Sequence, residues 1–208
     1  MARFIRHLVL ALAGGVVVAG CATGPRPTLV DAPAIDDPAI AELVDMLATA
    51  DDATFTAEYL ITVNYGGRTV NATVAQHGSD RSVTVGDIRF LWTSSSQRTC
   101  NLTTGECANG IDDTRISDVQ VTHQFWGRAM ALRIRTDADR DIGPARSYTI
   151  DVAGITATCA VIPVTGGDKS YCVSEAGPLA MYLGPDLSIE LTSWSTEINP
   201  DLFGVGST

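Results

Sequence analysis

Residues 55–74 read FTAEYLITVNYGGRTVNATV, and this segment decides the predicted fold. Apolar side chains alternate with mostly polar ones as far as Tyr65, which is typical of a half-buried strand. The Gly66-Gly67 pair tolerates positive φ and predicts a two-residue hairpin turn. Pairing across that turn would set Val63 opposite Val70 and bring the apolar faces of both strands together. The sequence therefore predicts an antiparallel sheet.

Two later segments also predict hairpins, because pairing across a predicted turn again brings apolar faces together. A turn at Ala153-Gly154 would place Val152 opposite Ile155, and a three-residue loop at 184–186 would place Leu183 opposite Leu187. Shorter strands are predicted at residues 81–85 and 88–92, joined by Gly86-Asp87.

Direct pairing of Cys159 with Cys172 raises a question about the sheet. It would put Tyr171 and Val173 on the face opposite Ile155 and its apolar neighbours. Either a bulge or a sheet covered on both faces would accommodate this arrangement, and the sequence leaves both open.

Two segments show helical spacing. Asp36 and Asp37 precede Pro38, which is favourable chemistry for a helix start. The apolar positions that follow have helical spacing and predict an amphipathic helix of about three turns: Ile40, Leu43, Val44 and Leu47. A second helical stripe is predicted in the insert at residues 112–141, formed by Val121, Phe125, Ala129 and Leu132. Part of the insert would equally suit a short strand, with Met130, Leu132 and Ile134 on one face. The acidic run 137–141 that follows is interpreted as a solvated charge run.

The N-terminus resembles a bacterial lipoprotein signal. Arg3 and Arg6 precede an apolar run at 8–18 that is too short to span a bilayer, and the box Val18-Ala19-Gly20-Cys21 follows. We expect residues 1–20 to be a signal peptide, residues 21–36 to be the lipidated Cys21 and a flexible tether, and residues 37–208 to form one domain. The protein would then be exported and anchored to the cell membrane, facing the extracytoplasmic side, by a diacylglyceryl or palmitate-type modification. The alternative is an uncleaved or ordinarily cleaved signal, which would leave Cys21 as a free thiol.

The four remaining cysteines predict disulfides because the chain is expected to be exported. They allow three connectivities, and local pairing is favoured because each pair flanks a plausible hairpin: Cys100 with Cys107, and Cys159 with Cys172. The spacings lack the close Cys-x-x-Cys clusters of zinc sites, so no metal site is predicted.

Composition argues against several classes of function. The chain has a formal net charge of −10, and Lys169 is its single lysine, which disfavours nucleic-acid binding. It carries no Gly-x-Ser-x-Gly elbow and no glycine-rich phosphate loop, and neither His77 nor His123 lies in a recognisable nucleophile setting. We expect a protein that is not an enzyme and has no cofactor; a small hydrolase using one of these histidines is a minor alternative.

The order of elements is helix, strands, helical insert and strands, which indicates an α+β fold with an antiparallel sheet. Together with the lipobox and the tether, this order resembles LolA-like lipoprotein carriers and, among them, the LppX/LprG-type actinobacterial lipoproteins. The resemblance implies a single domain, a curved and incomplete antiparallel β-barrel covered by short helices. The two cysteine pairs depart from LolA itself.

The resemblance also implies a function. Acyl chains would lie between sheet and helices, so the protein would bind a lipid or a lipoprotein acyl chain for carriage or presentation. The implied cavity wall comprises strand residues and two helical lids: Phe55, Tyr59, Ile61, Val63, Val70 and Val74 in the strands, with Leu43, Leu47, Phe125 and Leu132 in the lids. The alternative is a surface lipoprotein with a solid β core that serves as a scaffold for an envelope protein partner.

Overall fold

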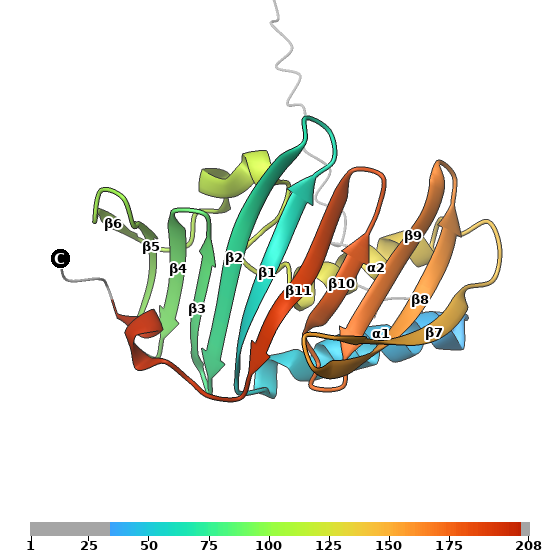
Figure 1. Ribbon diagram of the computed structural model, residues 1–208, viewed down its shortest axis with the longest axis horizontal. Coiled ribbons are helices and arrows are strands. Elements are labelled where there is room, and N and C mark those ends of the chain that lie inside the picture. Colours follow the sequence, from blue (N-terminus) through green and yellow to red (C-terminus); the bar gives the residue numbers. More distant parts are fainter. Residues whose placement is uncertain (1–33, 205–208) are drawn as a thin grey trace, which may run out of the picture. The chain divides into compact units, whose positions relative to one another are not determined.

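The computed structural model describes residues 34–204, so the predicted signal peptide and the predicted lipidation site at Cys21 lie outside the described residues. Within this range the chain forms one 11-stranded antiparallel sheet with the order β6-β5-β4-β3-β2-β1-β11-β10-β9-β8-β7 (Figure 1). The sheet is open, with β6 and β7 at its two edges. In the described range no helix combines the length and the apolar character that crossing a membrane requires.

The elements follow one another in a simple order. The helices and 3-10 turns are α1 (Pro38–Thr49), η1 (Ala50–Asp52), η2 (Asp113–Val119), α2 (Arg128–Ala138) and η3 (Pro200–Phe203). The strands are β1 (Phe55–Val63), β2 (Arg68–His77), β3 (Asp80–Val85), β4 (Ile88–Thr93), β5 (Ser96–Asn101), β6 (Cys107–Asn109), β7 (Arg146–Val152), β8 (Ile155–Val164), β9 (Gly167–Ser174), β10 (Leu179–Leu183) and β11 (Leu187–Ser195).

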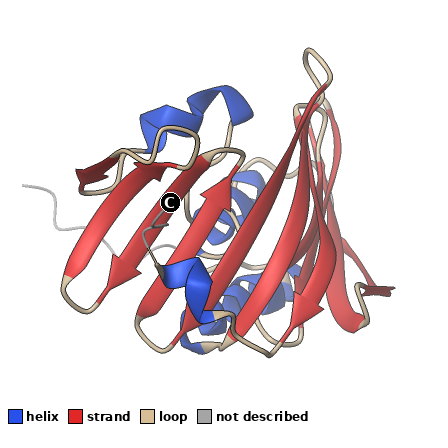
Figure 2. Ribbon diagram, turned by 60° about the vertical axis from the view of Figure 1, so that its left-hand side comes forward, coloured by secondary structure: helices blue, strands red, loops and turns tan. Residues whose placement is uncertain are grey.

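The sheet curves around α1 and α2, which lie against its inner face (Figure 2). Helix α1 begins as predicted, because the Asp37 side chain accepts a hydrogen bond from the Ala39 N–H at 2.9 Å and Pro38 occupies the first turn. All four residues of its predicted apolar stripe are buried. The end of α1 lies so close to the β9–β10 turn that a Cβ on Gly177 would stand 2.8 Å from the Ala50 nitrogen. Helix α1 is therefore closely packed on the sheet.

The first hairpin has the predicted faces but a different register. Val63 pairs with Arg68 and Ile61 pairs with Val70, two positions away from the predicted pairing. Asn64 does not extend the ladder to β2, because its backbone N–H and side-chain amide donate to Asp186 and Gly184 of the β10–β11 turn, each at 2.9 Å. A shift of two residues keeps every side chain on its face, so the prediction of the buried face is confirmed.

The other two hairpins differ in outcome. The Ala153-Gly154 turn pairs Val152 with Ile155, as predicted. In the β10–β11 hairpin, however, Leu183 pairs with Ser188 instead of Leu187, so the predicted register is wrong by one residue. The shift points Tyr182 inward and leaves Leu183 39% exposed. The inward ring packs against Tyr171, with ring centroids 4.8 Å apart.

Both predicted disulfides are present. Cys100–Cys107 joins β5 to β6 near one edge of the sheet, and Cys159–Cys172 joins directly paired residues of β8 and β9. Residues on both faces of β8 and β9 are buried, so the sheet is covered on both sides there and no bulge separates the two cysteines. Disulfides of this kind indicate an oxidising, extracytoplasmic compartment.

The predicted insert contains the 3-10 helix η2 in its first part and the α-helix α2 in its second part. Helix α2 starts at Arg128, while Val121 and Phe125 lie in the preceding loop. The buried positions of α2 are Met130, Ile134 and Asp137. Leu132, predicted on the apolar stripe, is 60% exposed. The prediction of a solvated run was wrong for Asp137, because its partners are supplied by β9.

Candidate functional site

The loop between η2 and α2 lies across the inner face of the sheet. The Phe125 ring meets Tyr59 edge-on with ring centroids 5.2 Å apart, and the Trp126 ring meets Phe55 in the same way at 5.4 Å. The Trp126 carbonyl accepts a hydrogen bond from the Leu179 N–H at 2.8 Å. These contacts anchor the loop to β1 and β10, and they fill the space inside β1 with aromatic side chains.

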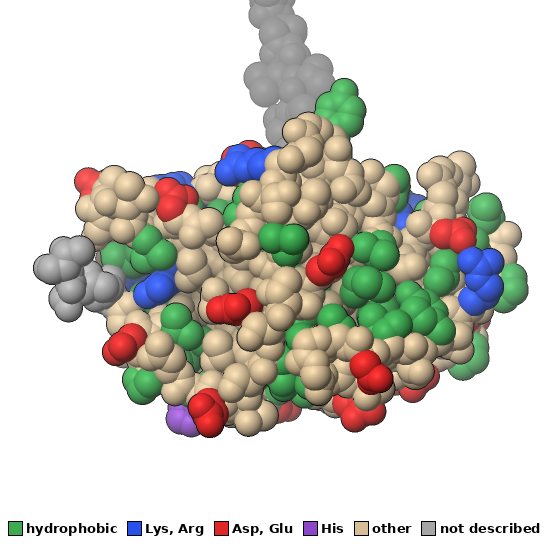
Figure 3. All heavy atoms as spheres, in the orientation of Figure 1, with side chains coloured by type: hydrophobic (Ala, Val, Ile, Leu, Met, Phe, Trp, Pro, Cys, Tyr) green, Lys and Arg blue, Asp and Glu red, His purple; other side chains and the backbone are tan. Residues whose placement is uncertain are grey.

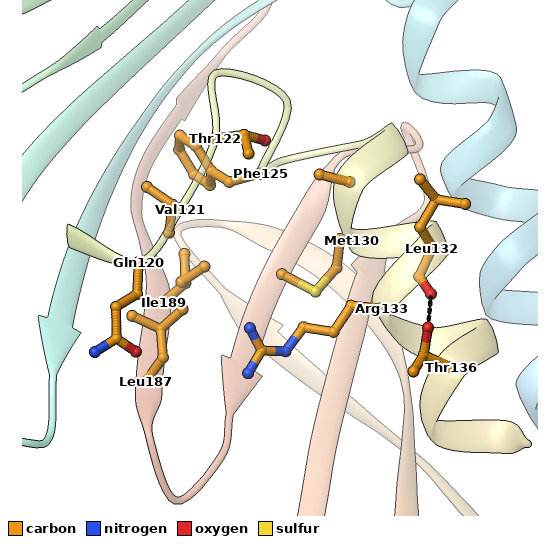
Figure 4. Close-up of a pocket in the computed structure, with 11 residues that line it drawn as sticks. Gln120, Val121, Thr122, Phe125, Met130, Leu132, Arg133, Thr136, Leu187 and Ile189 are labelled. Carbon is orange, nitrogen blue, oxygen red and sulfur yellow. Dashed lines mark hydrogen bonds between the residues drawn. The ribbon is translucent and has the colours of Figure 1, made fainter. Parts of the chain in front are cut away.

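A pocket of about 410 Å³ lies between this loop, α2 and β11 (Figure 4). Its buried lining is apolar and comes from all three elements: Val121, Phe125, Met130, Leu187 and Ile189. More exposed residues complete the lining: Gln120, Thr122, Ala129, Leu132, Arg133 and Thr136. The volume falls within the range of about 300 to 1,000 Å³ that is usual for small-molecule sites.

Arg133 is the charged residue of this lining. Its Nη2 donates a hydrogen bond to Asp186 Oδ2, and its guanidinium carbon lies 4.6 Å from the centroid of the Tyr182 ring. Burial alone would lower the pKa of the guanidinium, but Tyr182 and the Asp186 carboxylate together raise it. Burial likewise opposes ionisation of Asp186, yet Arg133 lowers the pKa of that carboxyl. Both groups are therefore charged at neutral pH.

A second polar group lies beneath α2. Asp137 Oδ1 accepts a hydrogen bond from Lys169 Nζ at 2.6 Å, and Oδ2 accepts one from the Tyr171 hydroxyl. The Asp137 side chain is only 4% exposed. Burial and the Asp137 carboxylate raise the pKa of Tyr171, and burial raises the pKa of the adjacent Tyr182 to about 12. Both phenols thus stay neutral and donate hydrogen bonds across the physiological range.

The structure places the ten predicted cavity residues unevenly. Only Phe125 and Leu132 line the pocket. Seven others are buried in one packed core, and Val70 is partly buried against it: Phe55, Tyr59, Ile61, Val63, Val74, Leu43 and Leu47 are the seven. Arg133 was not among the predicted site residues, although a single arginine between Leu132 and Ile134 was a usable signal in the sequence.

A smaller groove of about 330 Å³ separates α1 from α2. It is lined by Val44, Leu47, Ala48, Asp51, Arg128, Ala131, Leu132 and Arg135. Leu132 lines both this groove and the pocket, so it lies at the boundary between the two.

His77 and His123, the two histidines within residues 34–204, lie outside the pocket lining. His77 is exposed at the end of β2. His123 Nδ1 lies 2.8 Å from Asp113 Oδ2, and its ring lies 4.5 Å from the Trp92 ring, centroid to centroid. Within residues 34–204, no cluster of three or more His, Cys, Asp or Glu side chains could hold a metal ion.

Comparison with known proteins supports the fold and does not assign a family. No family model matches the chain, and no curated protein matches it. Among solved structures, a chain in the complex of Pseudomonas aeruginosa MucA/MucB superposes with a TM-score of 0.54 and 13% identity. That match covers 80% of this chain and 61% of the other, so this chain spans less than two thirds of its relative.

Two further structures superpose less well. A crystal structure of MucB gives a TM-score of 0.49 with 12% identity, covering 81% of this chain and 63% of that chain. An uncharacterized conserved protein from Thermus thermophilus gives a TM-score of 0.42 with 9% identity, covering 77% of this chain and 88% of that chain.

The fold is LolA-like. The sheet is curved, antiparallel and incomplete as a barrel, with short helices against its inner face, as the sequence resemblance implied.

Proposed function

We propose that this protein is a lipid-anchored, non-enzymatic protein of the cell envelope that binds one acyl chain of a lipid or lipoprotein. The pocket of about 410 Å³ between α2 and β11 carries the proposal, because it opens to the surface above a buried apolar floor. In this proposal residues 1–20 direct export, Cys21 carries the membrane anchor, and residues 37–208 form the binding domain.

Binding in such a pocket requires no bond to be made or broken. Each CH2 group transferred from water into an apolar site contributes about 0.8 kcal/mol. The buried side chains of Met130, Leu187 and Ile189 offer a surface of this kind. A volume of this size suits a single acyl chain, so the ligand would leave its remaining groups at the mouth.

Helix α2 is the element that would move to admit the chain. It separates the pocket from the groove on its other side, and Leu132 lies exposed at the boundary. Helix α1, by contrast, buries its whole apolar stripe against the sheet. We therefore assign the role of lid to α2 and not to α1.

A second candidate function is a scaffold that binds a protein partner. The P. aeruginosa relative with the same fold was solved as a MucA/MucB complex. The outer face of the sheet also offers an apolar area over β8–β10 (Figure 3), where Met181 and Leu183 alternate outward from Tyr182. Such a partner would leave the pocket under α2 without a role.

A pocket-filling variant separates the two functions. Ala129 and Ala131 lie on the same helix, but Ala129 lines the pocket and Ala131 lines the groove between the helices. The full chain carrying Cys21→Ser would be incubated with palmitate or a lysophospholipid and analysed by native mass spectrometry. We expect a one-to-one adduct that Ala129→Phe abolishes and Ala131→Phe retains.

The opposite results would overturn the proposal. Absence of any adduct on the parent chain would favour the protein scaffold. An adduct that survives Ala129→Phe and disappears with Ala131→Phe would move the binding site to the groove between α1 and α2.

A further inference from the structure

The pocket combines an apolar floor with one cationic side chain. Among the described residues that line it, Arg133 alone is charged, and its side chain is 28% exposed. Figure 4 shows the guanidinium reaching from α2 across the pocket toward Leu187 and Ile189. A ligand held by the floor would therefore meet this group.

The guanidinium has hydrogen-bonding capacity that its protein contacts leave unused. An arginine side chain carries five N–H groups, and Asp186 accepts from Nη2. The buried Nε has no hydrogen-bond partner in the described structure. The second oxygen of Asp186 is already engaged, because it accepts a hydrogen bond from the Tyr182 hydroxyl at 3.3 Å. Asp186 and Tyr182 thus hold the guanidinium in place and leave part of it available.

An anion is the ligand group that fits such a guanidinium. Carboxylates and phosphates accept charge-assisted hydrogen bonds from arginine in a fixed, planar geometry, and a partly buried site strengthens them. Exposed polar residues line the same pocket, Gln120 on the loop and Thr136 on α2, so the charged end of a ligand would lie near solvent. The tail would extend toward Phe125 and Met130.

We propose that Arg133 makes this pocket selective for acyl ligands that carry an anionic group, a carboxylate or a phosphate. The inference rests on the proposed acyl-binding function and adds the class of headgroup to it. Arg133 binds the anion through its unused N–H groups while Nη2 stays paired with Asp186. The net charge of −10 opposes anions at long range, so the selectivity is local to Arg133.

Three ligands with ten carbon atoms each test this selectivity: decanoate, decyl phosphate and decanol. Their affinities would be measured by calorimetry on the full chain carrying Cys21→Ser. We expect at least one anion to bind about tenfold more tightly than decanol, as one charge-assisted hydrogen bond allows. Decyl phosphate as the preferred ligand would point to a phospholipid, and decanoate would point to a free fatty acid.

Two variants on α2 test whether Arg133 causes the preference for anions. Arg133→Met keeps much of the side-chain length and removes the charge, so it should abolish the tenfold preference, and the variant should bind the two anions no more tightly than it binds decanol. Arg135→Met removes the same charge from the groove between the helices and should keep the preference. Circular dichroism spectra that match the parent chain would establish that both variants are folded.

The failures of the two proposals are distinguishable. Equal affinity of the parent chain for all three ligands would overturn the role of Arg133 and leave acyl binding in place. No binding of any ligand would overturn the acyl-binding function itself. An anion preference that survives Arg133→Met, or one that Arg135→Met removes, would place the anion outside this pocket and contradict the inference.

Discussion

Helices α1 and α2 lie against the same face of one sheet, yet different interactions hold them there. Helix α1 buries a continuous apolar stripe that includes Ile40 and Leu43. Helix α2 buries Met130, Ile134 and the charged Asp137, and it carries Arg133 beside the pocket. Apolar burial makes the first helix a fixed part of the core, whereas the second is held by two buried apolar side chains and a few polar contacts.

This difference suggests how one fold combines stability with binding. Apolar contacts of α1 cannot be replaced by water without loss of the hydrophobic contribution. Polar contacts of α2, such as Arg133 with Asp186, exchange for water at a smaller net cost. A helix held in this way can shift to admit a ligand while the rest of the core stays intact.

The largest expected effect is the loss of apolar packing under α1. Leu43→Ala should lower the free energy of unfolding by about 2 to 5 kcal/mol, because Leu43 is fully buried and its removal leaves a cavity. Urea denaturation followed by circular dichroism would measure the change. A loss below about 1 kcal/mol would contradict the assignment of α1 as the fixed helix.

The next effect concerns the polar contact beneath α2. Tyr171→Phe removes the hydroxyl that donates to Asp137 and leaves part of a buried carboxylate without a partner. We expect a loss of about 1 to 3 kcal/mol. Tyr148→Phe is a suitable control, since the Tyr148 hydroxyl lies 3.7 Å from Cys172 Sγ and the residue is partly exposed. Equal effects of the two variants would show that the Asp137 contact does not stabilise the fold.

A smaller effect should depend on pH. The folded pKa of Asp186 lies below its ordinary value of 3.8, so the ion pair with Arg133 stabilises the fold above that pH. This contribution is lost as the pH falls through the folded pKa. We expect Asp186→Asn to lower stability by at most about 1 kcal/mol near pH 6, because the pair is partly exposed.

The parent chain and Asp186→Asn should approach equal stability in acid. The stability difference between the parent chain and Asp186→Asn should shrink below pH 3.8. Urea denaturation at a series of pH values would measure it. A difference that stays constant with pH would mean that the Asp186 charge does not contribute.

The smallest effect is expected at the boundary of the pocket. Leu132 is 60% exposed, so Leu132→Ala should change stability by no more than about 0.5 kcal/mol. The same urea denaturation series would measure it. A loss comparable to that of Leu43→Ala would show that α2 is packed as firmly as α1 and would remove the contrast between them.

Local signals explain what the sequence could predict. Asp37, Pro38 and the apolar spacing after them contain all the information needed to place α1. The alternation in β1 likewise identified the buried face of the first hairpin. The register of this hairpin could not be predicted from local sequence. Asn64 leaves the ladder to contact Gly184 and Asp186, which lie far away in the sequence.

The candidate site was harder to predict because its residues depend on distant partners. Asp137 is part of an acidic run in the sequence, and it is buried because Lys169 and Tyr171 of β9 supply its hydrogen bonds. Tyr182 faces inward because Tyr171 and Arg133 pack against it, which shifts the hairpin register by one residue. Periodicity cannot detect pairings of this kind, since each residue alone fits a solvated or alternating pattern.

In the proposed function, the pocket beside α2 holds an acyl chain while the interior under α1 stays closed. Photolabelling the full chain carrying Cys21→Ser with a diazirine-bearing palmitate, followed by peptide mapping, tests it most directly. We expect labels on residues 120–136 and on the Leu187–Ile189 segment of β11. Labels confined to the α1 side of the groove, at Val44, Leu47 or Ala48, or no specific label at all, would contradict it.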